Sequence, residues 1–564
     1  MDKARGVGAD HRLSHRDDRR HLPDVRTGPL TGLAELVEGL LADEYAASPL
    51  TASSLGLTQY DGLLPDLSAD GIGRREALED LWLAQFEALP TPADPDDLAD
   101  RDLVVAFLRG RRVMRDWADW RRNPDHYTGP GLSGVFTLFL HRLRPDGDLV
   151  RDACQRLRAV PALLDQGRTN LDPALASPLL VRRALGQARG GVTYARTQLA
   201  ASVQDPALQA ELAAAGEVAA SAYQAFVGFL EDLEQRATGD WAIGEARYDA
   251  LLLEREGLSY GARELQERGR EEYASLEDET RRLTQQIAGH EDWRRLVDEL
   301  NLDAPASPEQ MREEYADATA RARDFLLEQG LVTMPDGETC TVDPSPVFMR
   351  SVLAVAFYIA PPALAAGAPT GHFFVPFPPD DASPEAVVDR LQSNARFSIP
   401  TTAVHEAYPG HHWHFAHLAA TQPRPLRSVF RTPYFTEGWG LFAEQVMREA
   451  GFFADPRHEL GQVQARLFRA ARMVVDPGLH LGELTVDEAS ELMATKTSLS
   501  PETARAEVAR YCAWPTQAPA YLTGALEIGR MAAAWTGDRR VFHDRLAGSG
   551  GLPIAVAERL LGSA

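Results

Sequence analysis

Hydrophobic residues recur at helical spacing along most of the first half of the chain. In segment 31–45 five apolar residues fall on one stripe, as in an amphipathic helix: Leu33, Leu36, Val37, Leu40 and Leu41. Segments of the same texture continue to about residue 290, and they share no fixed period, which argues against a solenoid. The pattern predicts a helical scaffold with no catalytic signature of its own.

The pattern changes near residue 301. The sequence "NLDAPASPEQ" (301–310) predicts a joint and then a helix start, with Ser307 as N-cap, Pro308 in the first turn and Gln310 completing a capping box. After this helix, "GLVTMPDGETCTV" and "GHFFVPFP" (371–378) have the turn-bounded, aromatic or β-branched composition of short strands. Helical texture then resumes and continues to the C-terminus.

The second predicted strand contains Pro376 and Pro378. Because proline has no N–H to give to a ladder, these residues predict an edge strand, which could hold an extended peptide by backbone pairing. The expected architecture is mainly α: a bilobed, metallopeptidase-like helical fold with a small β-sheet beside the active-site helix. Its parts are a flexible N-terminal tail (1–28), a helical scaffold lobe (29–300) and a catalytic lobe (301–564).

Composition narrows the possible settings and partners. Lys+Arg 58 against Asp+Glu 82 gives a net charge of −24, which disfavours nucleic acid as a partner. The three cysteines form no CxxC pair, and the first 28 residues contain no apolar core of a signal peptide. The longest uncharged run, "SVLAVAFYIAPPALAAGAPTG" (351–371), is interrupted by Pro361 and Pro362 and is a poor membrane helix. These features predict a cytoplasmic protein with no membrane partner.

Candidate chemistry is concentrated in "AVHEAYPGHHWHFAH" (403–417), which holds five of the 15 histidines. It opens like the zinc-peptidase motif HExxH at His405 and Glu406, but Pro409 occupies the place of the second histidine. On a regular helix, positions i+6 and i+7 do not lie beside position i. The partner of His405 would therefore be His411 or His412, and only in a distorted helix.

Pro409 and Gly410 predict such a distortion. Proline cannot donate to the carbonyl of His405 and crowds it, so the helix must bulge or kink. Glycine lets the backbone absorb the change. A bulged turn with two inserted residues would bring His411 to a metal ion.

A third ligand is expected on a later helix, in "TPYFTEGWGLFAEQVMREA" (432–450). A carboxylate on a separate helix commonly completes a peptidase zinc site with two histidines. Glu437 is the preferred ligand, because the adjacent Gly438 permits close approach of another backbone. Glu444 either orients a histidine from behind or belongs to a solvated helix face.

Three segments carry a family resemblance: "HEAYPGHHW", "EGWGLFAE" and "RYCAWPTQAPAYLTGALEIGRM" (510–531). They resemble the bacterial domain-of-unknown-function 885 family, which is grouped by similarity with helical zinc peptidases of the gluzincin kind, such as carboxypeptidase Taq and thimet oligopeptidase. The resemblance implies a Zn²⁺ ion held by His405, His411 and Glu437, with Glu406 as general base. His412 remains the alternative to His411.

The third segment contains a candidate catalytic tyrosine and one difference from the sequence pattern of the family. Tyr511 and Tyr521 both lie in this segment, and Tyr521 matches the tyrosine whose hydroxyl would face the tetrahedral oxyanion; the alternative for Tyr521 is a buried core tyrosine. The chain reads PTQA at 515–518 where the family has PGQA. Thr516 therefore replaces the glycine of a turn.

The function predicted by these features is a zinc-dependent hydrolase of short peptides. Two alternatives remain: a non-catalytic helical metal-binding protein, and an Fe(II) enzyme with two histidines and one carboxylate. The iron enzymes of that kind usually have β-barrels, and strand signals are few in this chain.

Overall fold

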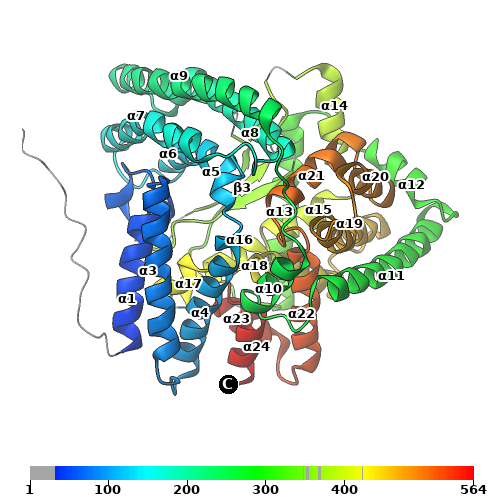
Figure 1. Ribbon diagram of the computed structural model, residues 1–564. Helices are drawn as coiled ribbons and strands as arrows, with labels where there is room; N and C mark the ends of the chain where they lie inside the picture. The colour runs from blue at the N-terminus through cyan, green and yellow to red at the C-terminus, as the bar shows by residue number, and fades with distance from the viewer. Residues whose placement is uncertain are drawn as a thin grey trace, which may run out of the picture.

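The computed structural model describes residues 32–346, 349–350, 355–365, 370–380, 382–421 and 424–563. The predicted flexible tail, residues 1–28, lies outside these ranges. Within them the chain is mainly helical with one small sheet (Figure 1), which confirms the predicted mainly α class. The metallopeptidase-like character of the fold stays a prediction.

The first part of the described chain forms two groups of helices (Figure 1). Helices α1, α3 and α4 stand side by side, and α6, α7, α8 and α9 form a layer at one end of them. Their bounds, with the two short helices between them, are α1 Leu33–Ala47, α2 Pro49–Ser54, α3 Ala69–Ala88, α4 Pro95–Arg115, α5 Asp125–Thr128, α6 Pro130–His141, α7 Asp146–Asn170, α8 Pro178–Thr193 and α9 Pro206–Arg236.

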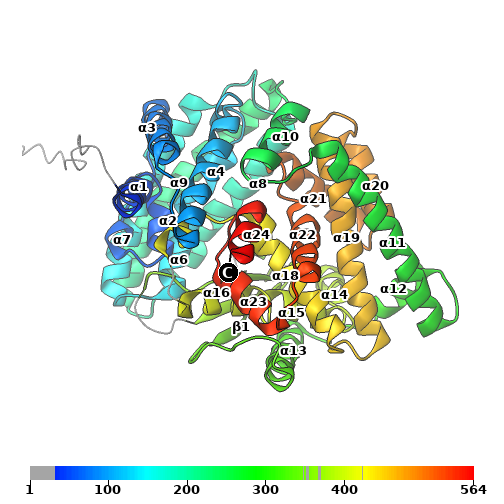
Figure 2. The same cartoon turned by 90° about the horizontal axis from the view of Figure 1, so that it is seen from below.

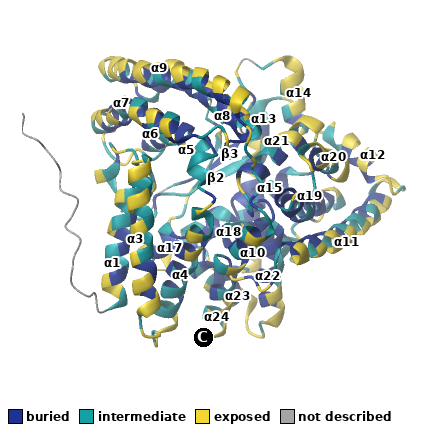
Figure 3. Cartoon of the chain, viewed as in Figure 1, coloured by how far each residue is buried: buried dark blue, intermediate teal, exposed yellow. Residues whose placement is uncertain are grey.

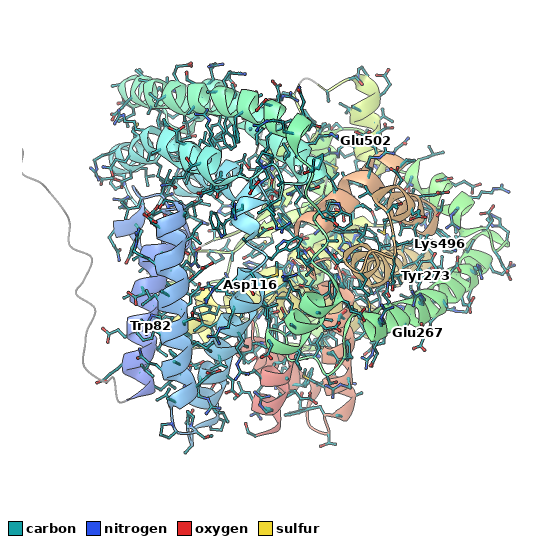
Figure 4. All side chains as sticks on the ribbon, viewed as in Figure 1. Trp82, Asp116, Glu267, Tyr273, Lys496 and Glu502 are labelled. Atoms are coloured by element: carbon teal, nitrogen blue, oxygen red, sulfur yellow. The ribbon has the colours of Figure 1, made fainter. Side chains whose placement is uncertain are left out.

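The apolar stripe predicted for α1 faces the core. Leu36, Leu40 and Leu41 are buried, while Leu33 and Val37 pack at the edge of the same cluster. Trp82 of α3 (labelled in Figure 4) packs in the same core, and its Nε1 donates to Asp43 of α1 at 3.0 Å.

The middle of the chain contains the predicted helix start at residue 307. The helices here are α10 Glu245–Glu254, α11 Ala262–Ala288, α12 Trp293–Asn301 and α13 Pro308–Gln329. Ser307 caps α13 by accepting from the backbone N–H of Gln310 at 3.2 Å. The Gln310 side chain accepts from the N–H of Ala306, one residue before the expected partner. The cap is confirmed, and its return bond is shifted by one residue.

The sheet has three strands: β1 Cys340–Pro344, β2 Phe357–Ile359 and β3 Gly371–Val375. Their order is β1-β3-β2, with β3 parallel to β1 and antiparallel to β2. The prediction of an edge strand at 371–378 is therefore wrong. The strand ends at Val375, so Pro376 and Pro378 lie beyond the ladder, and both edges of β3 are already paired. A peptide cannot add to this strand.

The C-terminal part is again helical, and its helices surround the histidine-rich segment. Their bounds are α14 Pro384–Gln392, α15 Ile399–Glu406, α16 His411–Ala420, α17 Pro425–Val429, α18 Pro433–Glu449, α19 Pro456–His480, α20 Val486–Lys496, α21 Pro501–Ala513, α22 Ala520–Ala534, α23 Arg539–Gly548 and α24 Ile554–Gly562. Helix α11 runs along α19, and α18 packs along α22 (Figure 2). The hydroxyl of Tyr273 on α11 donates to the carbonyl of Lys496 on α20 at 2.8 Å (Figure 4).

Buried hydrophobic residues form one large core and two smaller ones. Figure 3 colours each residue by its burial. The large core combines α1, α3 and α4 with α10–α13 and most of the C-terminal helices, so it contains side chains from both sides of residue 301. A second core joins α5–α9. The division into a scaffold lobe and a catalytic lobe at residue 301 stays a prediction. Among the described residues, no helix combines the length and the apolar composition that crossing a bilayer requires.

Candidate metal centre

The histidine-rich segment forms two helices with a tight connection instead of one bulged helix. Helix α15 ends at Glu406 and α16 begins at His411. The N–H of Gly410 donates to the carbonyl of Val404 at 3.0 Å, which closes a turn wider than that of an α-helix. The indole N–H of Trp439 on α18 donates to the Pro409 carbonyl at 2.9 Å and fixes the connection from outside.

Gly410 is sterically required in this turn. A Cβ atom there would lie 1.8 Å from the carbonyl oxygen of His405 and 2.4 Å from that of Val404. We therefore expect Gly410→Ala to lower the free energy of unfolding by roughly 1–3 kcal/mol, as overpacking does, and to weaken metal binding. Gly73→Ala on α3 is the matched control, because a Cβ at that exposed helical site meets open space. Denaturation of both variants checks this, and equal stabilities would contradict it.

The turn brings His405 and His411 together. Their ring centroids are 4.8 Å apart and their planes are nearly perpendicular, at 84°. From α18, the Oε2 atom of Glu437 lies 3.6 Å from Nε2 of His405 and 3.3 Å from Nε2 of His411. One ligand atom from each of these three side chains lies within 4.8 Å of the others. The three predicted ligands thus form one cluster.

The spacing of these atoms fits a metal ion better than direct hydrogen bonds. Two ligands bound to one tetrahedral zinc at about 2.0–2.1 Å are about 3.3–3.4 Å apart, close to both separations from Glu437 Oε2. Hydrogen bonds to a carboxylate are shorter, about 2.7–2.9 Å when charge-assisted. The donor set of two imidazoles and one carboxylate is one that zinc accepts.

The charges of the cluster also favour a cation. Burial disfavours a charged His405, but the carboxylates of Glu437, Glu444 and Glu406 outweigh burial and raise its pKa to about 10. Burial alone would raise the pKa of Glu437, yet the two histidines hold it well below its usual range. Several carboxylates therefore surround two imidazoles in an enclosed place, and positive charge is stabilised there, whether it comes from protons or from a metal ion.

Glu444 lies behind His405, as one of the two sequence interpretations expected. Its Oε1 atom is 2.9 Å from Nδ1 of His405, and the side chain is 1% exposed, so it does not belong to a solvated face. With Nδ1 donating to this carboxylate, the lone pair of Nε2 points toward Glu437 and is free to bind a metal ion.

We expect Glu444→Ala to weaken zinc binding about 10- to 100-fold, the usual effect of removing a carboxylate that orients a histidine ligand. Glu449→Ala on the last turn of the same helix is the control, because among the described residues Glu449 hydrogen-bonds only with Gln445, at an exposed site. Competition with a chelator measures both affinities. Equal affinities for the two variants would show that Glu444 does not support His405.

His412, the alternative to His411, is directed elsewhere. Its Nε2 atom lies 2.7 Å from Glu338 and its Nδ1 atom lies 3.0 Å from the Tyr358 hydroxyl. Both ring nitrogens are occupied, so the geometry favours His411. Glu338 was missed by sequence reasoning, because nothing marks a residue 74 positions upstream as the partner of a histidine.

Glu406 lies at the cluster with a free carboxylate. It is the last residue of α15, it is 9% exposed, and its carboxylate accepts no hydrogen bond among the described residues. Burial raises its pKa, against the attraction of His405 and His411. An enclosed carboxylate without a fixed partner beside the ligand histidines is placed to exchange a proton with a molecule bound there.

Tyr521 of α22 (Ala520–Ala534) packs against His405. The two rings are stacked, with centroids 6.3 Å apart and planes at 20°. Burial and the charge of Glu437 raise the pKa of Tyr521, so its hydroxyl stays protonated and can donate. Tyr511, by contrast, donates to Glu507 at 2.8 Å and accepts from Arg472, which makes it a structural residue.

Close contact between α18 and α22 sets the distance between Glu437 and Tyr521. A Cβ atom on Gly438 would lie 2.6 Å from the Cα of Gly524, so the two backbones touch, as the sequence predicted for Gly438. Sequence reasoning gave no role to Gly440, where a Cβ would lie 2.8 Å from the His405 ring. The sequence feature that could have revealed this role is the second glycine of "EGWG" (437–440).

The turn before α22 forms although the family glycine is absent. Thr516 has φ 67°, in the left-handed region that glycine adopts freely and that β-branched residues rarely occupy. Its backbone N–H donates to Asp476 at 3.2 Å, which helps to hold this conformation.

Fold and site together define a mainly helical protein with an enclosed His-His-Glu cluster. The chain belongs to the family described as "Bacterial protein of unknown function (DUF885)", whose model matches residues 49–561. This confirms the resemblance to that family. No curated protein matches the sequence.

Two solved structures share the fold. One is described as "a putative lipoprotein of unknown function" from Shewanella oneidensis, with 18% identity, a TM-score of 0.74, and coverage of 94% of this chain and 100% of that chain. The other is described as "the putative lipoprotein" from Colwellia psychrerythraea, with 21% identity, a TM-score of 0.81, and coverage of 94% and 98%. At these identities the likeness shows the fold alone.

These descriptions overturn one prediction. The cytoplasmic location inferred from cysteine spacing and from the first 28 residues is wrong, because both similar structures are described as lipoproteins. The physical reason is that an attached lipid can hold a protein at a membrane without any apolar helix in its fold.

Proposed function

We propose that this protein is a zinc-dependent hydrolase of short peptides, similar in mechanism to the helical gluzincins that its motifs resemble. The observation that supports this most is that Glu437 Oε2 lies 3.6 Å from His405 Nε2 and 3.3 Å from His411 Nε2, near the separations in a tetrahedral zinc site, with one ligand atom of each residue within 4.8 Å of the others. These three side chains would hold the ion. When bound, zinc would supply a Lewis acid that polarises the scissile carbonyl and acidifies water.

The remaining steps belong to side chains of this chain. Glu406, next to His405 in α15, would accept a proton from the attacking water and pass it to the leaving amine. Tyr521, stacked on His405, would donate a hydrogen bond to the oxygen that becomes negative in the transition state. Glu444 would keep His405 oriented throughout.

Metal analysis of the purified protein, followed by cleavage of a mixed peptide library, tests the proposal. About one zinc per chain together with cleavage is the expected result. Iron in its place would favour the two-histidine, one-carboxylate iron enzymes. Zinc without cleavage would favour a non-catalytic metal-binding protein, and absence of metal would contradict the site.

For Tyr521→Phe we expect turnover to fall by roughly 10²-fold with zinc retained, the effect of losing one oxyanion donor. Tyr434→Phe is the matched control, since that buried hydroxyl on α18 has no hydrogen-bond partner among the described residues. Steady-state kinetics of both variants and of the parent give the comparison. A parental rate for Tyr521→Phe would return this tyrosine to a packing role.

A further inference from the structure

A cavity of about 790 Å³ lies beside the metal centre. Phe415, one turn after His411 on α16, and Thr436, one residue before Glu437 on α18, belong to its wall. The ring of Phe415 stacks on the ring of His411 with centroids 6.4 Å apart. Much of the remaining wall is apolar: Leu55, Tyr358, Ile359, Pro361 and Pro362.

One basic side chain in this wall has no counter-charge. Arg431 lines the cavity, and its Cζ atom lies 4.8 Å from the centre of the Phe415 ring. Its guanidinium makes no ion pair and no hydrogen bond with the described residues. Burial lowers its pKa, and no neighbouring carboxylate offsets that effect. Arg431 is partly buried, and a charge that is partly withdrawn from water without a counter-charge costs free energy, so its place in this wall calls for an explanation.

Nearby groups show how unusual this is. Arg427, four residues earlier, is buried and paired with Asp96 at 2.8 Å and Asp100 at 2.7 Å. Of the two carboxylates in the cavity wall, Glu338 already pairs with Arg323 and His412 at 2.8 and 2.7 Å, and the exposed Asp336 makes no ion pair with Arg431. The guanidinium of Arg431 is therefore left to bind an anion that enters the cavity.

We propose that Arg431 binds the C-terminal carboxylate of the peptide substrate, so that the enzyme acts at the C-terminal end of peptides. This rests on the proposed function. Guanidinium and carboxylate form paired, charge-assisted hydrogen bonds, a geometry suited to this recognition. The apolar wall would accept the side chain of a terminal residue.

The distance from Arg431 to the metal centre fits this role. Because the Phe415 ring contacts both groups, the guanidinium and the His411 ring are separated by no more than the sum of the two measured distances, 4.8 and 6.4 Å. An extended peptide advances about 3.3–3.6 Å per residue. No more than about three residues therefore span the gap, which corresponds to release of a single residue or a very short C-terminal fragment.

The test compares a mixed tetrapeptide library made once with free C-terminal acids and once with C-terminal amides. We expect the zinc-loaded protein to cleave the acids at least about tenfold faster in kcat/KM. Arg431→Gln should lower kcat/KM for the acids about 10- to 10²-fold, the effect of losing charged hydrogen bonds. The ratio of kcat/KM for acids to that for amides should then be close to one. Arg431→Lys, which keeps the charge, should retain part of the preference for acids over amides.

A control variant and a binding experiment complete the test. Arg295→Gln removes the same charge from an exposed pair with Glu299 on α12 and should retain the parental preference. Binding of both libraries to Glu406→Gln protein, measured by mass spectrometry of retained peptides, tests recognition without turnover. Equal cleavage or equal binding of acids and amides would overturn the carboxylate site while leaving the hydrolase intact. Cleavage of neither library, with acids still retained preferentially, would contradict the hydrolase and support the role of Arg431.

Discussion

Glu406→Gln is expected to reduce peptide hydrolysis by at least about 10²-fold, the low end of general-base contributions, while fold and zinc content stay unchanged. Glutamine has nearly the shape of glutamate but cannot accept the proton of the attacking water. The carboxylate is enclosed, follows His405 directly and accepts no hydrogen bond among the described residues, so the substitution breaks no such bond. The loss should therefore appear in turnover and not in stability.

The measurement combines zinc content, thermal unfolding and cleavage of the same peptide library for both proteins. Glu256→Gln is a suitable control, because it makes the same change at another buried glutamate, one that pairs with Thr432 outside the cluster. That control should keep the parental rate. If Glu406→Gln cleaves as fast as the parent, another group must be the base.

Periodicity predicted the helices well because their apolar stripes are complete in the local sequence. The stripe of α1 and the cap at Ser307 need only neighbours within one or two turns, and both formed. The prediction that the strand at 371–378 lies at the edge of the sheet was wrong, because it depends on residues that are distant in the sequence. Whether β3 is central depends on β2, at residues 357–359, which periodicity did not reveal because that strand is only three residues long.

The candidate site shows the same division. Residue types and spacing were enough to select His405, Glu406 and Glu437, because zinc chemistry restricts ligands to a few side chains. Sequence could not decide between His411 and His412. That choice depends on the wide turn at Gly410 and on Glu338, which holds His412 from a distant part of the chain.

Arg431 is the clearest residue that no local pattern could reveal. An arginine before a helix is usually solvated or paired, and its sequence neighbours contain no hint of a cavity. Arg431 is partly buried and has no carboxylate partner among the described residues. Both features arise only when α16, α17 and α18 come together in the fold. Residues that await an external partner are the ones sequence reasoning is least able to find.

His405→Ala and Glu437→Ala are each expected to lower zinc content from about one ion per chain to near zero, and to abolish hydrolysis with it. Each substitution leaves two protein ligands where catalytic zinc sites have three. The loss should also be visible in stability. A ligand present at 100 times its Kd stabilises the folded state by about 2.7 kcal/mol, so zinc should raise the unfolding temperature of the parent and barely change that of either variant.

The adjacent residues His411 and His412 provide a matched pair of variants for this experiment. His411→Gln should behave like His405→Ala, because its Nε2 lies 3.3 Å from Glu437. His412→Gln should keep its zinc and lose only stability, because this neighbour pairs with Glu338 and Tyr358. If His412→Gln loses zinc and His411→Gln retains it, the turn between α15 and α16 must bind the metal in another arrangement. Zinc retained by both His405→Ala and Glu437→Ala would place the ion outside this cluster altogether.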